Sequence, residues 1–346
     1  MWEILQSIVF SSFRNQIFLN VFLINKTLIK TNLSLTKFSL DIVIFIFILK
    51  KVILHYEHHK MKIFKNKKTK TIVETIILLI VLLIGCLLFR HIQKHIFFYP
   101  WNDISSYEQL QKNSDFEEVN IVSDGKNLNG WMYYNNPKWE KSPLVIYFGG
   151  NAQNSSNTMA YFLDLWIFDY FEWYNVLMVD YPEYGYSEWT IWEYTMFKAA
   201  MTIYEWAANQ PDVDENNIII MWYSIWTGVA TYCASMNKIN GLILIAPYDQ
   251  ALSLYNNAIN IFHGPLKLLA KYKFDSLSYS KNIDTEVQVI TSYDDEVICY
   301  KFSQNLSNNF KNHKDIIILD NNVKHSDYFS QSVVLNAIKD YLSERL

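Results

Sequence analysis

Residues 217–236 read Asn-Ile-Ile-Ile-Met-Trp-Tyr-Ser-Ile-Trp-Thr-Gly-Val-Ala-Thr-Tyr-Cys-Ala-Ser-Met, and this stretch decides the fold. The β-branched apolar run at 218–220 predicts a buried strand. The run rich in small residues from Thr227 onward is compatible with a helix. Ser224 lies between them, where the strand would turn into the helix. We expect this corner to lift the Ser224 hydroxyl above the sheet and to aim the backbone N–H of Ile225 at a developing oxyanion.

The residues that flank Ser224 do not suit such a corner. A serine at a sharp strand-to-helix turn normally lies in the pattern G-x-S-x-G, because the two backbones pass too close for side chains. Trp222 and Trp226 occupy both glycine positions here. Two indoles there are expected to clash. Either the site is inactive, or these tryptophans are not what the cell makes.

The 346 residues are enough for one large domain with an appendage. Residues 1–95 carry a net charge of +10, whereas residues 96–346 carry −14. A basic arm before an acidic globular domain argues against nucleic-acid binding. The three cysteines, Cys86, Cys233 and Cys299, show neither a disulfide framework nor metal-ligand spacing.

The N-terminal extension, residues 1–60, contains no Gly, Pro or Ala. Two interpretations compete for it. It is a membrane-associated segment, or it is sequence upstream of a true start at Met61, and the second is slightly favoured.

A transmembrane anchor is expected within residues 61–95. A cluster of lysines precedes residues 71–89, which are almost wholly apolar apart from Glu74. Nineteen residues are long enough for one membrane-spanning helix. The positive-inside rule then places the lysines in the cytoplasm and the following domain outside.

Residues 96–346 alternate between strand and helix patterns. A hairpin is expected at 118–123 and 128–134, around Asp124-Gly125-Lys126-Asn127. Further strands are expected at 144–148, 175–180, 241–246, 287–291 and 315–319, and helices at 158–165, 195–208, 299–308 and 333–342. The largely helical segment near 248–275 is expected to form a small lid. This order predicts an α/β fold with a doubly wound, mostly parallel sheet.

A nucleophilic serine needs a base to take its proton and an acid to orient that base. Three histidines follow Ser224 in the sequence: His263, His313 and His325. His325 is the expected base, because it follows the last strand, where this type of fold delivers its histidine.

The acid is expected on the loop after the penultimate strand. Asp295 lies there and is the preferred candidate, with Asp294 as the near alternative. Asp249, at the end of the preceding strand, is a weaker candidate.

Backbone donors for the oxyanion are expected after the first central strand. Gly149-Gly150 there would let the N–H of Asn151 or Ala152 pair with that of Ile225. Ser187, in a similar-looking stretch that leads into a polar loop, is expected to be structural.

Taken together, these stretches resemble the α/β-hydrolase superfamily, in particular its membrane-anchored serine hydrolases (serine-aminopeptidase-like or alpha/beta hydrolase domain-containing proteins). The resemblance covers about residues 96–346. It is carried by residues 148–154, 179–188, 210–214, 222–226, 294–297 and 324–327. It implies hydrolysis of an ester, thioester or amide with no cofactor, and leaves the substrate unidentified.

The departures from this family share one residue type. The family expects glycine at positions 189, 222 and 226, and tryptophan occupies all three. Trp139, Trp166, Trp173 and Trp192 also lie in turn-like settings, whereas Trp101, Trp131 and Trp206 look ordinary. UGA encodes Trp in some genetic codes and Gly in others. We therefore hypothesise that the unusual tryptophans are glycine codons read in the wrong code.

Two functions follow from these observations. The first is a membrane-anchored serine hydrolase for a small-molecule, acyl or peptide substrate, with Ser224, His325 and Asp295 as its triad. The alternative is a catalytically dead protein of the same fold that binds a ligand or partner, its corner blocked by Trp222 and Trp226. If the chain is made with these tryptophans, we expect poor folding and no reaction with a serine-directed probe.

Overall fold

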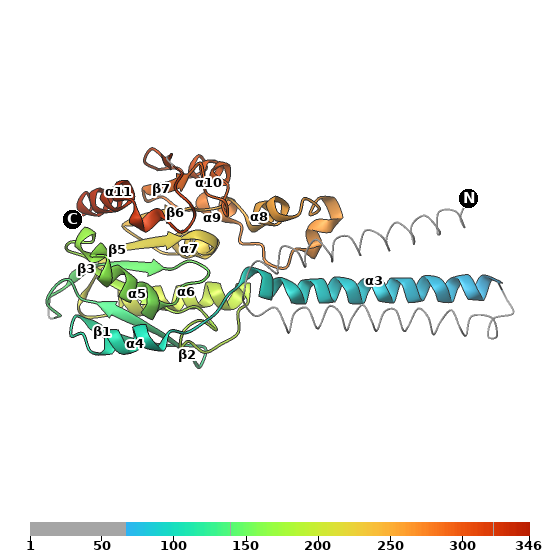
Figure 1. Ribbon diagram of the computed structural model, residues 1–346, viewed down its shortest axis with the longest axis horizontal. Coiled ribbons are helices and arrows are strands. Elements are labelled where there is room, and N and C mark those ends of the chain that lie inside the picture. Colours follow the sequence, from blue (N-terminus) through green and yellow to red (C-terminus); the bar gives the residue numbers. More distant parts are fainter. Residues whose placement is uncertain (1–66, 139, 321) are drawn as a thin grey trace. The chain divides into compact units, whose positions relative to one another are not determined.

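The computed structural model describes residues 67–138, 140–320 and 322–346 (Figure 1). The N-terminal extension, the start at Met61 and Trp139 lie outside the described residues. The chain divides between Leu82 and Leu83 into two compact units. The second unit, Leu83–Leu346, contains the sheet and all of the residues proposed for the site.

The apolar segment forms helix α3, Lys67–Phe97, which is longer than residues 71–89. Within it, Thr71–His95 is long and apolar enough to cross a membrane, and an 18-residue window of this segment has a mean hydropathy of 3.0. Its leucines and isoleucines are exposed, for example Leu79 and Leu83 at 59% and 60%. By length and composition, α3 is therefore the candidate membrane anchor.

The expected hairpin is present. Strand β1, Phe116–Ser123, pairs antiparallel with β2, Lys126–Tyr133. Asp124 and Gly125 both have positive φ, 47° and 74°. That backbone suits the twist of a two-residue hairpin turn, which is why Asp-Gly predicts it.

One eight-stranded sheet forms the centre of the second unit, in the order β1-β2-β4-β3-β5-β6-β7-β8 (Figure 1). β2 pairs antiparallel with β4, and every pairing from β4 to β8 is parallel. The remaining strands are β3 (Ser142–Phe148), β4 (Asn175–Val179), β5 (Val213–Tyr223), β6 (Gly241–Ile245), β7 (Val287–Ser292) and β8 (Ile317–Leu319). The carboxyl ends of the parallel strands therefore share one edge.

Helices cover both faces of this sheet. The larger ones are α5 (Ser155–Asp164), α6 (Glu193–Ala208), α7 (Thr227–Met236), α10 (Tyr300–Ser307) and α11 (Ser332–Ser343). Along β5, Ile220 and Trp222 join the core that contains α6 and α7. Ile219 and Met221 join the core that contains α5 and α11. This alternation follows from the two-residue period of a strand that is buried on both faces.

Four short helical elements were not expected from the sequence or were expected only in outline. Helix α4, Ile104–Gln111, precedes the hairpin and is capped by the Asp103 carboxylate. Between β6 and β7, the expected lid region contains α8 (Ala251–Ala258) and η3 (Gly264–Leu269), and α9 (Ser276–Ser280) follows it. We refer to residues 248–275 below as the insert.

Candidate active site

The corner predicted around Ser224 is present. β5 ends at Tyr223, a 3₁₀ turn covers Ser224–Trp226, and α7 begins at Thr227. Ser224 has φ of 67°, in the left-handed region that non-glycine residues avoid. Such a conformation costs of order 1–3 kcal/mol and is typical of functional sites.

His325 contacts the Ser224 side chain. The distance from Ser224 Oγ to His325 Nε2 is 2.7 Å, although 101 residues separate them. His325 lies on the loop after β8, the position expected from the strand order. The Tyr223 hydroxyl donates to the His325 carbonyl oxygen, and the Glu296 carboxylate accepts from the His325 backbone N–H at 3.2 Å. These two contacts fix the backbone that carries the imidazole, and the sequence analysis did not foresee them.

Asp295 completes the hydrogen-bonded chain. Its Oδ2 lies 2.8 Å from His325 Nδ1. The neighbouring Asp294 accepts instead from the backbone N–H of Asn322 at 3.1 Å, and Asp249 accepts from the Asn305 side chain at 2.8 Å. Of the three acidic candidates, the structure therefore brings Asp295 to the imidazole.

The surroundings of Asp295 favour its charged form. The side chain is fully buried, which opposes ionisation, but hydrogen bonds from His325 and from two backbone N–H groups outweigh this, and the pKa of Asp295 lies below its usual value. With the carboxylate at Nδ1, the proton of neutral His325 is held on Nδ1, and Nε2 is left to accept from Ser224.

Tyr328 is a further partner of Asp295 that sequence reasoning missed. Its hydroxyl donates to Asp295 Oδ2 at 2.9 Å. Burial and the adjacent Asp295 charge raise the pKa of Tyr328 well above its usual value, so it remains a donor. The only available signal was its position three residues after His325, in a loop whose conformation the sequence does not reveal.

The Gly149-Gly150 turn lies against the serine corner. A Cβ at Gly150 would come within 2.9 Å of the Tyr223 ring, so only glycine fits. Gln153 holds the turn, because its side-chain oxygen accepts from the Gly150 N–H at 2.5 Å. Within the described residues, the backbone N–H groups of Asn151 and Ala152 make no hydrogen bond. They are thus free to bind an anion.

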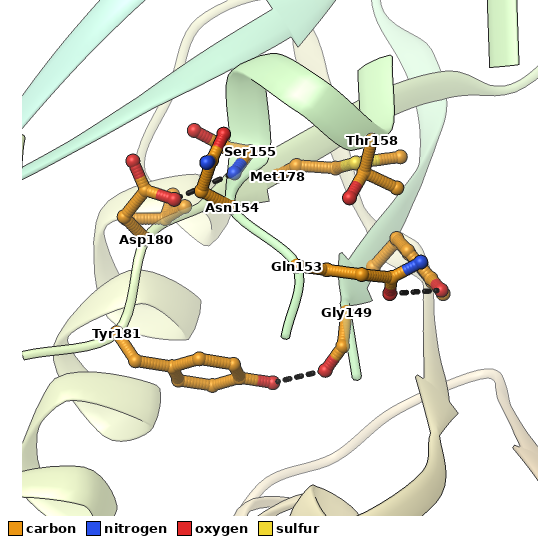
Figure 2. Close-up of a pocket in the computed structure, with 10 residues that line it drawn as sticks. Gly149, Gln153, Asn154, Ser155, Thr158, Met178, Asp180 and Tyr181 are labelled. Atoms are coloured by element: carbon orange, nitrogen blue, oxygen red, sulfur yellow. Dashed lines mark hydrogen bonds between the residues drawn. The ribbon is translucent and has the colours of Figure 1, made fainter. Parts of the chain in front are cut away.

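A small cavity lies behind this turn, lined by residues of β3, β4 and α5 and by the loops next to them (Figure 2). Asp180 is buried there and accepts from the Ser155 backbone N–H at 2.6 Å, at the start of α5. Burial raises the pKa of Asp180 to about 6. Tyr181 donates from its hydroxyl to the Gly149 carbonyl oxygen at 3.1 Å (Figure 2). Asp180 and Tyr181 therefore hold the two ends of the predicted oxyanion loop.

The other candidates lie apart from this chain of hydrogen bonds. His263 contacts Asn260, and His313 contacts the Lys314 carbonyl oxygen, and both are exposed. Ser187 is buried and donates to the Asp180 carbonyl oxygen at 2.8 Å. In the described part of the chain, no cluster of His, Cys, Asp or Glu side chains is arranged to hold a metal ion.

The two tryptophans beside Ser224 point into the core. Both are fully buried, and Trp222 stacks on Phe148 at 3.9 Å and Trp226 on Phe98 at 4.9 Å between ring centroids. Neither indole N–H makes a hydrogen bond of normal geometry with the described residues. The expected clash does not displace Ser224, whose hydroxyl still reaches His325. Neither ring therefore separates the Ser224 hydroxyl from the His325 imidazole.

Comparison with known proteins agrees with this fold. No family model matches the sequence. Similar solved structures include Est1E of Butyrivibrio proteoclasticus with ferulic acid bound, at 17% identity and TM-score 0.53 over 66% of this chain and 98% of that one. An esterase of Pyrococcus furiosus aligns at 16% identity and TM-score 0.54, covering 72% and 96%.

A third similar structure is the acylaminoacyl peptidase of Pyrococcus horikoshii, at 16% identity and TM-score 0.51. It covers 70% of this chain and 43% of that chain. An alpha/beta hydrolase of Penicillium also aligns, at TM-score 0.52. The resemblance seen in the sequence is thus confirmed at the level of the fold, which is that of the α/β-hydrolases.

Proposed function

We propose that this chain of α/β-hydrolase fold is a membrane-anchored serine hydrolase that cleaves an ester, thioester or amide through an acyl-enzyme on Ser224. One observation carries the proposal. The Asp295 carboxylate, the His325 imidazole and the Ser224 hydroxyl form a continuous hydrogen-bonded chain, with distances of 2.8 Å and 2.7 Å. The esterases and the peptidase among the similar structures support the same chemistry.

In this proposal each group has one role. His325 Nε2 takes the proton of Ser224 as its oxygen attacks the substrate carbonyl, and later gives that proton to the leaving group. Asp295 stabilises the imidazolium that forms in between. The backbone N–H of Ile225 and that of Asn151 or Ala152 stabilise the oxyanion. Water then releases the acyl group from Ser224 by the same steps, and no cofactor is required.

The substrate class follows from this chemistry and from the similar proteins. One of these proteins is described as an esterase, and another is described as an acylaminoacyl peptidase. We therefore propose a small-molecule ester or an acylated peptide as substrate, without a nucleic-acid partner.

The location follows from α3. Its length and apolar surface fit a single membrane span. Lysines 67, 68 and 70 precede that span. By the positive-inside rule the catalytic unit would then lie outside the cytoplasm.

The test is a burst of product from a chromogenic ester such as p-nitrophenyl butyrate. An acyl-enzyme predicts a rapid burst equivalent to one product per chain, followed by slower turnover. Ser224→Ala should abolish the burst, whereas Ser343→Ala, an exposed serine on α11, should retain it. The assay is run on the chain and on its Trp222→Gly/Trp226→Gly variant. The absence of a burst in both would favour the alternative, a binding protein without catalysis.

A further inference from the structure

The insert is held against the last turns of α3. Gln93 is buried, and its side-chain N–H donates to the Leu269 carbonyl oxygen at 2.8 Å. Its side-chain oxygen accepts from the Tyr255 hydroxyl at 2.6 Å and from the Lys271 backbone N–H at 2.7 Å. One buried amide thus joins α3 to three separate points of the insert.

Two more contacts show that the insert packs on α3 near Phe89 and Arg90, where the apolar run of the helix ends. The Phe89 ring stacks on Phe262 with 6.0 Å between centroids, and the Arg90 guanidinium donates to the Leu268 carbonyl oxygen at 2.6 Å. Phe89 ends the continuous apolar run of α3 and Arg90 is the first charge after it. In a spanning helix this change marks the boundary between hydrocarbon and headgroups.

The tip of the insert, residues 259–268, exposes large apolar side chains. Leu268 is 76% exposed, and Ile259, Leu266 and Ile261 are 54%, 48% and 45% exposed. Four such side chains within ten residues, beside a helix that could enter a bilayer, expose apolar area that water does not favour.

The charged side chains of the tip and of the residues just after it are all basic, although the Glu193 carboxylate accepts from the Lys273 backbone N–H at 3.1 Å. Residues 257–273 contain Lys267, Lys271 and Lys273 and no Asp or Glu, in a domain whose net charge is −14. Burial, and to a lesser extent the nearby Lys94 and Arg90 charges, lowers the pKa of Lys271. Apolar side chains among lysines are the composition of a membrane-surface segment.

From these contacts we infer that the tip of the insert, residues 259–268, lies in the headgroup region of the bilayer that α3 spans, with anionic lipid as its partner. The inference rests on the proposed function only in that it assumes the α3 anchor. Continuity with α3 argues for a lipid surface here, because the same residues that end the span hold the insert. The basic charge argues for an anionic one.

The experiment places a fluorophore at single cysteines of the full chain in vesicles. Cys86 and Cys299 are first replaced by Ala, the buried Cys233 is kept because the label cannot reach it, and the label is attached through Leu268→Cys, Val333→Cys or Ile80→Cys. Val333 is an exposed apolar residue of α11, 56% exposed, and serves as the matched control. The vesicles contain phosphatidylcholine and phosphatidylserine, with or without lipids that carry a quencher on the acyl chain, placed near the headgroup for positions 268 and 333 and near the chain end for position 80.

The label at position 268 should lose more than half of its emission to the quencher, and the label at 333 should lose almost none. Position 80 reports on the anchor independently. Quenching at 80 without quenching at 268 would overturn the inference and leave the anchor intact. If neither is quenched, both the anchor and the inference fail.

The charge is tested separately. Lys267→Gln/Lys273→Gln should reduce quenching at position 268 in vesicles with phosphatidylserine and bring it close to the level seen with phosphatidylcholine alone. Lys301→Gln, an exposed lysine on α10, is the control and should leave it unchanged. Equal quenching in both lipids for every variant would contradict the anionic partner.

Discussion

The two sides of the candidate site differ in how completely their polar groups are paired. On the loop side, Asp295 accepts four hydrogen bonds, from the His325 ring, the Tyr328 hydroxyl and two backbone N–H groups. On the corner side, the indole N–H groups of Trp222 and Trp226 are buried without a hydrogen bond of normal geometry among the described residues. The Asp295 carboxylate proposed for the chemistry is fully hydrogen-bonded. At positions 222 and 226, where the fold needs only a small residue, large side chains leave buried donors without a well-formed hydrogen bond in the described part of the chain.

The tryptophans also fall into two groups, those with hydrogen-bonded indole N–H groups and those at positions that suit glycine. Trp131 is buried and donates to the Ser156 hydroxyl at 2.9 Å, and Trp101 donates to the Ala152 carbonyl oxygen at 2.7 Å. Trp166 and Trp189 have φ of 57° and 86°, which glycine adopts readily. The pattern is what glycine codons read as tryptophan would produce. The coding sequence should therefore have UGA at 166, 189, 222 and 226 and UGG at 101 and 131. UGG at the first four would refute the hypothesis.

The largest effect on activity is expected at Asp295, whose carboxylate accepts four hydrogen bonds. Asp295→Asn should lower ester turnover by about 10⁴-fold, because an amide at this position favours the wrong imidazole tautomer. Asp294→Asn is the matched control and should retain most of the activity. Steady-state rates with p-nitrophenyl butyrate measure both. Similar losses in the two variants would remove Asp295 from its proposed role.

The next effect concerns the corner. Trp222→Gly/Trp226→Gly should raise thermal stability, because it removes two overpacked rings and two unpaired N–H groups, each costing roughly 1–3 kcal/mol. Trp131→Gly should instead destabilise the fold by roughly 3–5 kcal/mol, as for an ordinary buried aromatic residue. Unfolding midpoints by circular dichroism give the sign of each change. If the double variant lost as much stability as Trp131→Gly, the Trp222 and Trp226 indoles would be ordinary core residues that stabilise the fold.

Two buried carboxylates should give pH dependences of opposite sign. The pKa of Asp180 is raised to about 6 from an ordinary 3.8, so its contribution to stability is present below pH 3.8 and is lost as the pH rises through 6. A shift of this size corresponds to about 3 kcal/mol. Asp180→Asn should remove this loss. Asp295, with its lowered pKa, contributes above its ordinary pKa and loses that contribution as the pH falls.

Denaturant unfolding at pH 4 and pH 7.5 compares the Asp180→Asn variant with the parent chain. The difference in unfolding free energy between the two pH values should shrink in this variant. An unchanged difference would show that Asp180 does not titrate in this range.

The smallest expected effect comes from backbone strain. Trp189→Gly should stabilise the fold by about 1 kcal/mol, because a non-glycine residue with φ of 86° is strained. Trp192→Gly is the control, since Trp192 has an extended backbone with φ of −139°. Thermal unfolding of the two variants distinguishes them. Stabilisation by both variants, or by neither, would mean that the positive φ at Trp189 is not the cause of an energetic cost at this position.

Much of the sheet could be predicted because its strands are buried on both faces and read as β-branched runs. The run 218–220 and Gly241–Ile245 are examples, and their order determines which edge carries Ser224. The strand that each residue follows was also enough to predict Ser224, Asp295 and His325 as one triad. Helix α4 was missed because its eight residues have little apolar periodicity and begin only at the Asp103 cap.

Other features depend on contacts distant in sequence. The choice between Asp294 and Asp295 depends on how one loop folds, since adjacent residues point in different directions. Tyr328 and the Tyr223 contact with the His325 backbone could not be predicted for the same reason. The packing of the insert on Gln93 joins residues 162 or more positions apart, and no local pattern encodes such a contact.

The most direct test of the catalytic chain is the site of covalent attachment of a fluorophosphonate probe, read by mass spectrometry of the labelled chain and its peptides. The account predicts one adduct per molecule, on Ser224, in the Trp222→Gly/Trp226→Gly form, and none after Ser224→Ala. An adduct on another serine, or labelling that survives Ser224→Ala, would contradict it.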